Sequence, residues 1–107
     1  MFTLIDSVLK YDTINQINFC EKAVFFKFGA DWCAPCQQLE TILNDFDYCE
    51  KILYKIDVEN EDFENIILNE DIITIPVNIV KYTGKTEKFS GVKSKEELID
   101  LLNKMKQ

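Results

Sequence analysis

Apolar and polar residues recur along the chain with two different periods, one typical of strands and one typical of helices. The run from Ala23 to Phe28 is almost wholly apolar, as expected for a central strand that is covered on both faces. After it, Leu39, Leu43 and Phe46 recur at helical spacing and predict one long helix. On this basis strands are expected over residues 2–5, 23–28, 51–58, 77–82 and 86–90, and helices within 6–19, 33–48, 62–69 and 94–105.

The order of these elements predicts how the sheet is built. A strand-helix-strand unit crosses over right-handed and makes its two strands parallel. The last two strands are separated only by Thr83-Gly84-Lys85, so they should form an antiparallel hairpin. The expected fold class is therefore α/β, with a mixed sheet of four to five strands and helices on both faces.

Polar residues at two helix starts suggest where those helices begin. Ser94 followed three residues later by Glu97 is a capping box and predicts the start of the last helix. The first helix should be capped by Ser7 or by Asp12. Its buried side is expected to consist of Val8, Ile14 and Ile17.

Length and charge exclude several classes of protein. A chain of 107 residues is long enough for one domain, spanning 1–107, and too short for two. Its net charge of −7, from 12 basic and 19 acidic residues, argues against binding to nucleic acid or to anionic membranes. No apolar run is long enough for a membrane span, and residues 1–10 lack the features of a secretory signal. We therefore expect a cytoplasmic protein.

The segment Trp32-Cys33-Ala34-Pro35-Cys36 lies where the apolar strand gives way to the long helix. The start of a helix has unpaired N–H groups and a partial positive charge, both of which favour a thiolate. The pKa of Cys33 should therefore be lowered, which makes its sulfur the attacking nucleophile. Cys33 should occupy an exposed place, whereas Cys36 lies one turn further in, less exposed and in reach to resolve a mixed disulfide. Pro35 suits the first turn.

Two cysteines at this spacing also make half of a structural metal site. The chain has no histidine and no second C-x-x-C, so it cannot complete such a site in the usual way. The same lack of histidine excludes Cys–His and Ser–His–Asp nucleophiles. A redox role is therefore favoured. The other two thiols, Cys20 and Cys49, should be free, with a second disulfide between them as the alternative.

The residues around this motif resemble the thioredoxin family. Residues 28–36 are similar to the active-site segment of that family, and Thr74-Ile75-Pro76 is similar to its cis-proline loop. Gly84 and Gly91 match two of its usual glycines. The resemblance covers the whole chain and implies the thioredoxin fold.

The resemblance also implies a function. The chain would be a cytosolic thiol-disulfide oxidoreductase that reduces protein disulfides through Cys33 and Cys36, with no bound cofactor. Its partners would be disulfide-containing proteins and a separate thioredoxin reductase, linked to NADPH or to ferredoxin, and it would act as a monomer. Two alternatives remain open at this point: an oxidase or isomerase, and a binding module whose thiols are inert. Ala34 replaces the usual glycine of the family, and this replacement is only weak support for an oxidase or isomerase.

Substrate binding is implied for an apolar groove beside the cysteines. Pro76 would be cis and would face the pair, which leaves the backbone of Ile75 free to meet an extended substrate. Trp32 would shield the pair and touch partners. The expected groove residues are Trp32, Ala34, Pro35, Ile75, Pro76, Gly91 and Val92.

Lys27 is the single charge inside the central strand, and it departs from the family. Thioredoxins carry there a buried aspartate that handles the proton of the inner cysteine. Glu40 lies four residues after Cys36, on the same helical face, and that face should look down on Lys27. Lys27 and Glu40 are therefore candidates for a catalytic pair that handles this proton. Its charges would be exchanged, with the positive charge on the strand and the carboxylate on the helix. The alternative is that Lys27 extends to the surface and Glu40 is solvated.

Overall fold

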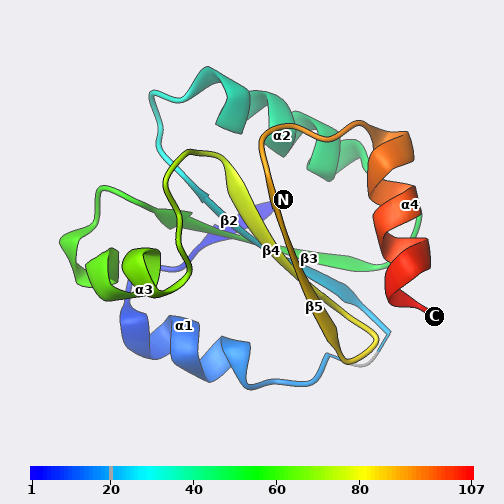
Figure 1. The fold of residues 1–107 in the computed structure, drawn as a ribbon, viewed down its shortest axis with the longest axis horizontal. Helices are drawn as coiled ribbons and strands as arrows, with labels where there is room; N and C mark the ends of the chain where they lie inside the picture. Colours follow the sequence, from blue (N-terminus) through cyan, green and yellow to red (C-terminus); the bar gives the residue numbers. More distant parts are fainter. Residues whose placement is uncertain (20) are drawn as a thin grey trace.

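A five-stranded sheet in the order β1-β3-β2-β4-β5 forms the centre of the molecule. The structure, a computed structural model, describes residues 1–19 and 21–107 (Figure 1). The elements are β1 (Phe2–Leu4), α1 (Val8–Asn15), β2 (Ala23–Gly29), α2 (Ala34–Asp45), β3 (Lys51–Asp57), the 3-10 turn η1 (Glu61–Phe63), α3 (Glu64–Asn69), β4 (Val77–Tyr82), β5 (Lys85–Ser90) and α4 (Lys95–Met105).

The strand directions agree with the prediction from the sequence. β1 and β2 both pair with β3 in parallel, and β4 pairs antiparallel with β2 and with β5. Figure 1 shows α2 and α4 on one side of the sheet and α1 and α3 on the other. The mixed sheet with helices on both faces is thus confirmed, and five strands form it.

Each face of the sheet has its own core because β2 sends alternate side chains to opposite sides. Phe25 packs with the apolar faces of α2 and α4, including Leu39 and Leu102. Phe26 and Phe28 pack on the other face, where α1 and α3 lie. β2 is buried along its whole length, as a central strand should be. Lys27 is part of it, on the same face as Phe25, and is one of two buried polar residues in the described part of the chain.

The prediction for the first helix was partly wrong. Ser7 is its N-cap, with its side chain accepting a hydrogen bond from the backbone N–H of Lys10 at 3.2 Å. The helix ends at Asn15, so Ile17 no longer shares its periodicity and is 47% exposed. The residue that the helix buries is Tyr11, which makes edge contacts with Phe26. Val8 and Ile14 are half-buried against the same core.

Other boundaries differ by a few residues. The long helix begins at Ala34 and ends at Asp45, with Cys33 outside it as the N-cap. The expected helix over 62–69 is split into η1 and α3, because Asn60 accepts a hydrogen bond from the backbone N–H of Asp62 at 3.0 Å and starts a tighter turn. None of the described helices has the length and apolar character that crossing a bilayer requires.

The capping box of α4 is present in full and gives a first test of the structure. Ser94 accepts from the N–H of Glu97 at 3.2 Å, and Glu97 accepts from the N–H of Ser94 at 3.0 Å. We expect Ser94→Ala to lower the free energy of unfolding by about 1 kcal/mol, measured by urea denaturation. Ser90→Ala, an exposed change in β5, is the control and should have a much smaller effect. Equal effects of the two changes would contradict this account of the cap.

Candidate functional site

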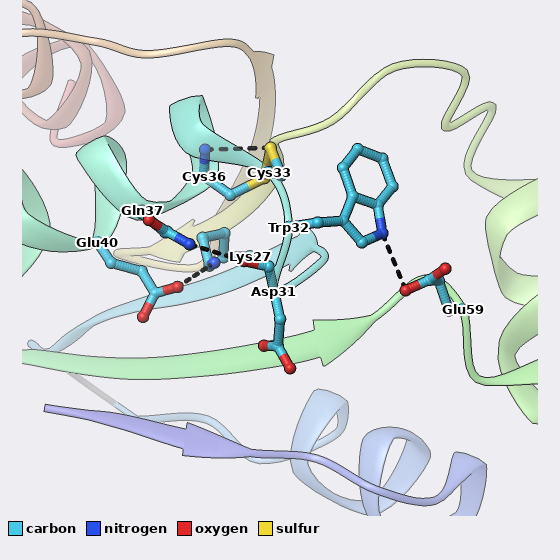
Figure 2. Close-up of a disulfide and its surroundings, with 8 residues drawn as sticks. All are labelled: Lys27, Asp31, Trp32, Cys33, Cys36, Gln37, Glu40 and Glu59. Carbon is cyan, nitrogen blue, oxygen red and sulfur yellow. Dashed lines mark hydrogen bonds and ion pairs between the residues drawn. A yellow bond between two sulfur atoms is a disulfide. The ribbon is translucent and has the colours of Figure 1, made fainter.

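Cys33 and Cys36 form a disulfide at the point where the loop after β2 enters α2 (Figure 2). Their Cα atoms are 5.2 Å apart. Cys33 is the N-cap of α2, and its sulfur accepts a hydrogen bond from the backbone N–H of Cys36 at 3.2 Å. Pro35 lies in the first turn, where its missing N–H is not needed. The Cys33 sulfur thus lies at the helix start, where one backbone N–H donates to it.

The exposure of the pair is lower than expected. Cys33 is only 4% exposed and Cys36 is fully buried. The expectation that Cys33 occupies an exposed place was therefore wrong, although it remains the outer of the two. The reason is a small cluster in which both cysteines pack with Ala30 and in which Ile75 and Val58 cover them. A partner must therefore approach the Cys33 sulfur along the surface formed by its neighbours.

Trp32 lies beside the disulfide and is 69% exposed, which agrees with an open platform. Its indole N–H donates a hydrogen bond to Oε1 of Glu59 at 3.0 Å, as Figure 2 shows. Glu59 in turn donates its backbone N–H to a carboxylate oxygen of Asp57, at the end of β3, at 2.9 Å. The sequence alone did not indicate this role of Glu59, because it belongs to an acidic stretch typical of a solvated surface. The bond holds the exposed indole in one orientation.

The second wall of the site is the loop before β4. The Ile75–Pro76 peptide bond is cis, as the family resemblance implied. The carbonyl of Pro76 accepts a hydrogen bond from the N–H of Gly91 at 2.8 Å, which joins this loop to the residue after β5. Ile75 packs against Cys33 and Cys36, whereas its own N–H and C=O bond to nothing in the described part of the chain.

The remaining expected groove residues differ in how far they are exposed. Ala34 and Pro35 are exposed on the first turn of α2. Val92 follows Gly91 and is half-buried against the core shared by α2 and α4. The disulfide, Trp32 and the loop around Pro76 therefore share one end of the sheet, at the carboxyl end of β2.

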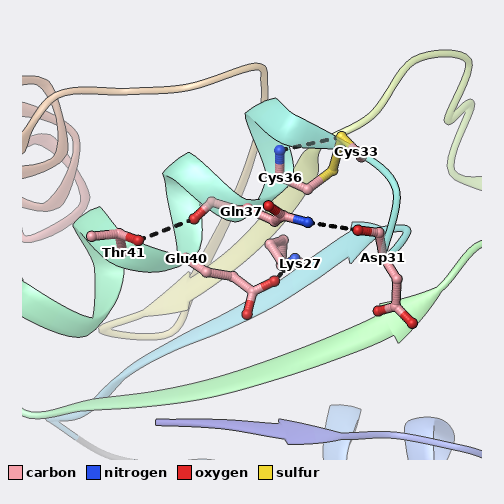
Figure 3. Close-up of polar contacts among 7 residues, drawn as sticks. All are labelled: Lys27, Asp31, Cys33, Cys36, Gln37, Glu40 and Thr41. Atoms are coloured by element: carbon pink, nitrogen blue, oxygen red, sulfur yellow. Dashed lines mark hydrogen bonds and ion pairs between the residues drawn. A yellow bond between two sulfur atoms is a disulfide. The ribbon is translucent and has the colours of Figure 1, made fainter.

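Lys27 and Glu40 form an ion pair below the disulfide (Figure 3). The Lys27 ammonium lies 2.6 Å from a carboxylate oxygen of Glu40. The side chain of Lys27 is 3% exposed and that of Glu40 is 27% exposed. The alternative in which Lys27 extends to the surface is therefore wrong. A buried ammonium needs an anion beside it, and Glu40 supplies that anion.

A pocket of about 200 Å³ lies next to this pair. Its lining includes Lys27, Gly29, Asp31, Glu40, Lys55 and Asp57. The side-chain amide of Gln37 donates to the backbone carbonyl of Asp31 at 2.6 Å, which fixes the loop after β2 against α2. The sequence did not indicate this pocket, because its lining residues come from segments that are far apart in the sequence.

The other cysteines lie outside this site. Cys49 is a half-buried free thiol before β3, at the opposite end of the sheet. Burial raises the pKa of the Cys49 thiol, which disfavours its reactive thiolate. Cys20 lies outside the described residues. Within those residues, no three or more Cys, Asp or Glu side chains gather as a metal site would require.

Comparison with known proteins agrees with this geometry. Residues 8–104 match the thioredoxin family model. The chain is 30% identical to the chloroplastic M-type thioredoxin of Triticum aestivum over 94% of this chain and 61% of that protein. It is 34% identical to thioredoxin of Bacillus subtilis (strain 168) over 78% of this chain and 83% of that protein. The chain thus spans about three fifths of the length of the wheat protein.

Solved structures show the same fold. A mutant thioredoxin from Halobacterium salinarum superimposes with a TM-score of 0.75 and 22% sequence identity. The superposition covers 96% of this chain and 88% of that one. The family match over nearly the whole sequence shows that the chain belongs to the thioredoxin family, and its Cys33–Cys36 disulfide has the C-x-x-C spacing of that family's active site.

Proposed function

We propose that this protein is a protein-disulfide reductase that carries two electrons from a separate reductase to disulfides in other proteins. The observation that carries the proposal is the Cys33–Cys36 pair at the start of α2, with one backbone N–H donating to the Cys33 sulfur. Such a pair can cycle between dithiol and disulfide without a bound cofactor. The rest of the site is interpreted around this cycle.

The cycle begins with the reduced pair. The Cys33 thiolate attacks a sulfur of the target disulfide, and the first target sulfur leaves with the electron pair and takes up a proton from water. Cys33 and the target are then joined by a mixed disulfide. Cys36 loses its proton and attacks the Cys33 sulfur, which releases the second target sulfur as a thiolate. The target is reduced by two electrons and the pair is oxidised to the disulfide.

The groove beside the pair is the proposed binding site for the target. The free N–H and C=O of Ile75 suit an extended target segment, which would pair with them as an added strand. Trp32, Ala34 and Pro35 would contact that segment from the exposed side, and Pro76, Gly91 and Val92 would complete the other wall. Main-chain pairing explains how one groove can accept many sequences.

The partners and the compartment follow from the same proposal. The pair must be reduced again by a thioredoxin reductase, linked either to NADPH or to ferredoxin. We propose that the protein acts as a monomer in the cytoplasm, where thiols are kept reduced. Its net charge of −7 disfavours nucleic acid and anionic membranes as partners.

Glu40 and Lys27 are proposed to handle the proton of Cys36. The chain has no histidine, so a carboxylate is the natural acceptor near neutral pH. Glu40 lies one helical turn after Cys36 and borders the pocket that Gly29 also lines. Gly29 lies next to the Cys36 sulfur, so we propose that water in this pocket carries the proton from Cys36 to Glu40. Lys27 keeps the carboxylate in place through the 2.6 Å contact.

The cysteine roles can be tested by turbidity during insulin reduction with dithiothreitol. The parent should accelerate precipitation of the insulin chains, Cys33→Ser should abolish the acceleration, and Cys36→Ser should accumulate covalent target adducts. In the reduced protein, Cys33 should be alkylated faster than Cys36 or Cys49, because the helix start favours its thiolate. A protein without any acceleration would be an inert binding module, and faster alkylation of Cys36 would reverse the two roles.

Stability measurements test whether the ion pair is needed by the fold. Glu40→Gln should lower the free energy of unfolding by about 3 kcal/mol, because it leaves a buried ammonium unpaired. Lys27→Met should cost less, since the freed carboxylate is partly solvated. The double variant Lys27→Met/Glu40→Gln should recover most of the stability that Glu40→Gln alone loses. Glu50→Gln, in the exposed pair with Lys22, is the matched control and should change stability by less than about 1 kcal/mol.

The pH dependence of the resolving step tests the proposed proton acceptor. Glu40→Gln should slow release of the target from the mixed disulfide by about tenfold or more near neutral pH, because the proton must then leave to water alone. The first attack by Cys33 should be almost unchanged. The two steps are separated by rapid-mixing kinetics across a range of pH. If the profiles of Glu40→Gln and the parent superimpose, Glu40 has no part in the proton transfer.

A further inference from the structure

Gly29 occupies the position between the inner cysteine and the buried lysine. A Cβ atom at this residue would lie 2.9 Å from Sγ of Cys36 and 3.3 Å from Nζ of Lys27. The sulfur and the ammonium therefore both border the space that a side chain at residue 29 would fill, and the sum of these distances limits their separation to 6.2 Å. No left-handed backbone conformation demands a glycine here, unlike at Gly84 and Gly91. What the glycine provides is the space between two side chains.

The charged side chains near Gly29 show which group pairs with the Lys27 ammonium. Figure 3 shows the Lys27 side chain below the cysteine pair, directed to Glu40. The other charged groups that border the adjoining pocket are Asp31, Lys55 and Asp57. Among the described residues none of these three forms an ion pair with Lys27, whereas Glu40 lies at 2.6 Å. In the oxidised state, Glu40 is the partner of the ammonium.

Resolution of a mixed disulfide disturbs this arrangement. If the Cys36 proton passes to Glu40, the carboxylate becomes neutral and the ammonium of Lys27 loses its counter-charge. Lys27 is almost fully buried, so an unpaired ammonium there would be strongly unfavourable. The same proton transfer, however, creates a new anion, the Cys36 thiolate, on the other side of Gly29. A negative charge within about 6 Å of an ammonium is stabilised by it.

We propose that Lys27 exchanges its ionic partner during turnover, from Glu40 to the Cys36 thiolate, and that Gly29 keeps the space between them open. This inference rests on the proposed disulfide reductase function. In the exchange, the S–H bond of Cys36 breaks and an O–H bond forms on Glu40, while Lys27 stays protonated. The thiolate then attacks Cys33, and the target sulfur leaves with the electron pair. Loss of the proton from Glu40 to water restores the Lys27–Glu40 pair of the oxidised state.

The exchange makes Lys27 a charge partner of the resolving sulfur as well as of the carboxylate. The three groups keep a net charge of zero while the proton passes from Cys36 to Glu40, because it then moves only within the set. When the thiolate attacks Cys33 its charge leaves with the target sulfur, and the charge of the set returns to zero once Glu40 loses its proton to water. This explains how a lysine can stand where the family carries an aspartate. It also assigns a role to Gly29, whose replacement by any larger residue would put atoms too close to both the ammonium and the sulfur and force them to shift.

Titration of Cys36 by NMR, through its Cβ chemical shift, tests the exchange directly. The measurement uses the full chain with Cys33→Ser, so that Cys36 stays reduced and cannot form the disulfide. Lys27→Met and the double variant Lys27→Met/Glu40→Gln should both raise the titration midpoint of Cys36 by about one pH unit or more. The double variant decides the matter, since it removes both charges and leaves no buried ion unpaired.

Two further variants make the test specific to the pairing across Gly29. Lys55→Met removes a lysine that lies level with Lys27 on the neighbouring strand and borders the same pocket, and it should move the midpoint far less. Gly29→Ala should raise the midpoint although both charges are kept, because its methyl group would crowd both the sulfur and the ammonium and displace them from their present positions.

An unchanged midpoint in the double variant would overturn the proposal, and so would equal shifts in Lys27→Met and Lys55→Met. Insulin reduction by the parent is measured alongside. If the parent reduces insulin and the midpoint does not move, only the exchange fails. If the parent does not reduce insulin, the proposed function itself fails.

Discussion

The junction between β2 and α2 is the constraint on which the rest of this structure depends. β2 is buried along its whole length, and α2 packs across it through Leu39 and Leu43, so the start of the helix has one fixed position above the end of the strand. That position places Cys33 at the free N–H groups and Cys36 directly above Gly29. The chemistry of the site follows from this packing, because the helix fixes the backbone positions of both cysteines.

The buried ion pair is a second consequence of that junction. A lysine in the middle of a central strand would be costly by itself, because the sheet and α2 cover it. The same helix that places Cys36 also brings Glu40 within 2.6 Å of the ammonium. One helix thus positions both the reactive sulfur and the counter-charge beneath it, which is the basis of the proposed proton transfer between them.

The features that the sequence made predictable are those set by short-range patterns. The apolar run at 23–28, the capping box at Ser94 and the cysteine spacing each depend on neighbours within a few residues. The Lys27–Glu40 pair could also be predicted from the sequence, because helical spacing fixes the face on which Glu40 lies.

The features that were missed depend on contacts distant in sequence. The hydrogen bond from Trp32 to Glu59 joins two loops 27 residues apart. The burial of Cys33 depends on its contact with Ile75. The space beside the Cys36 sulfur and the Lys27 ammonium exists because Gly29 has no side chain. Ile17 was misplaced because a helix can end one turn before its apolar pattern does. The first three features have no periodic signal in the sequence, and for Ile17 the periodic signal continued past the end of the helix.

The central claim is that the Cys33–Cys36 pair acts as a reductant, and its reduction potential tests this most directly. The pair would be equilibrated with glutathione or dithiothreitol buffers of known potential, and the fraction of disulfide measured by mass spectrometry. Reducing members of this fold have potentials of about −270 mV and strongly oxidising ones about −120 mV. The account predicts a value close to the reducing end of this range. A value close to the oxidising end would show that the protein donates its disulfide to partners instead of reducing theirs.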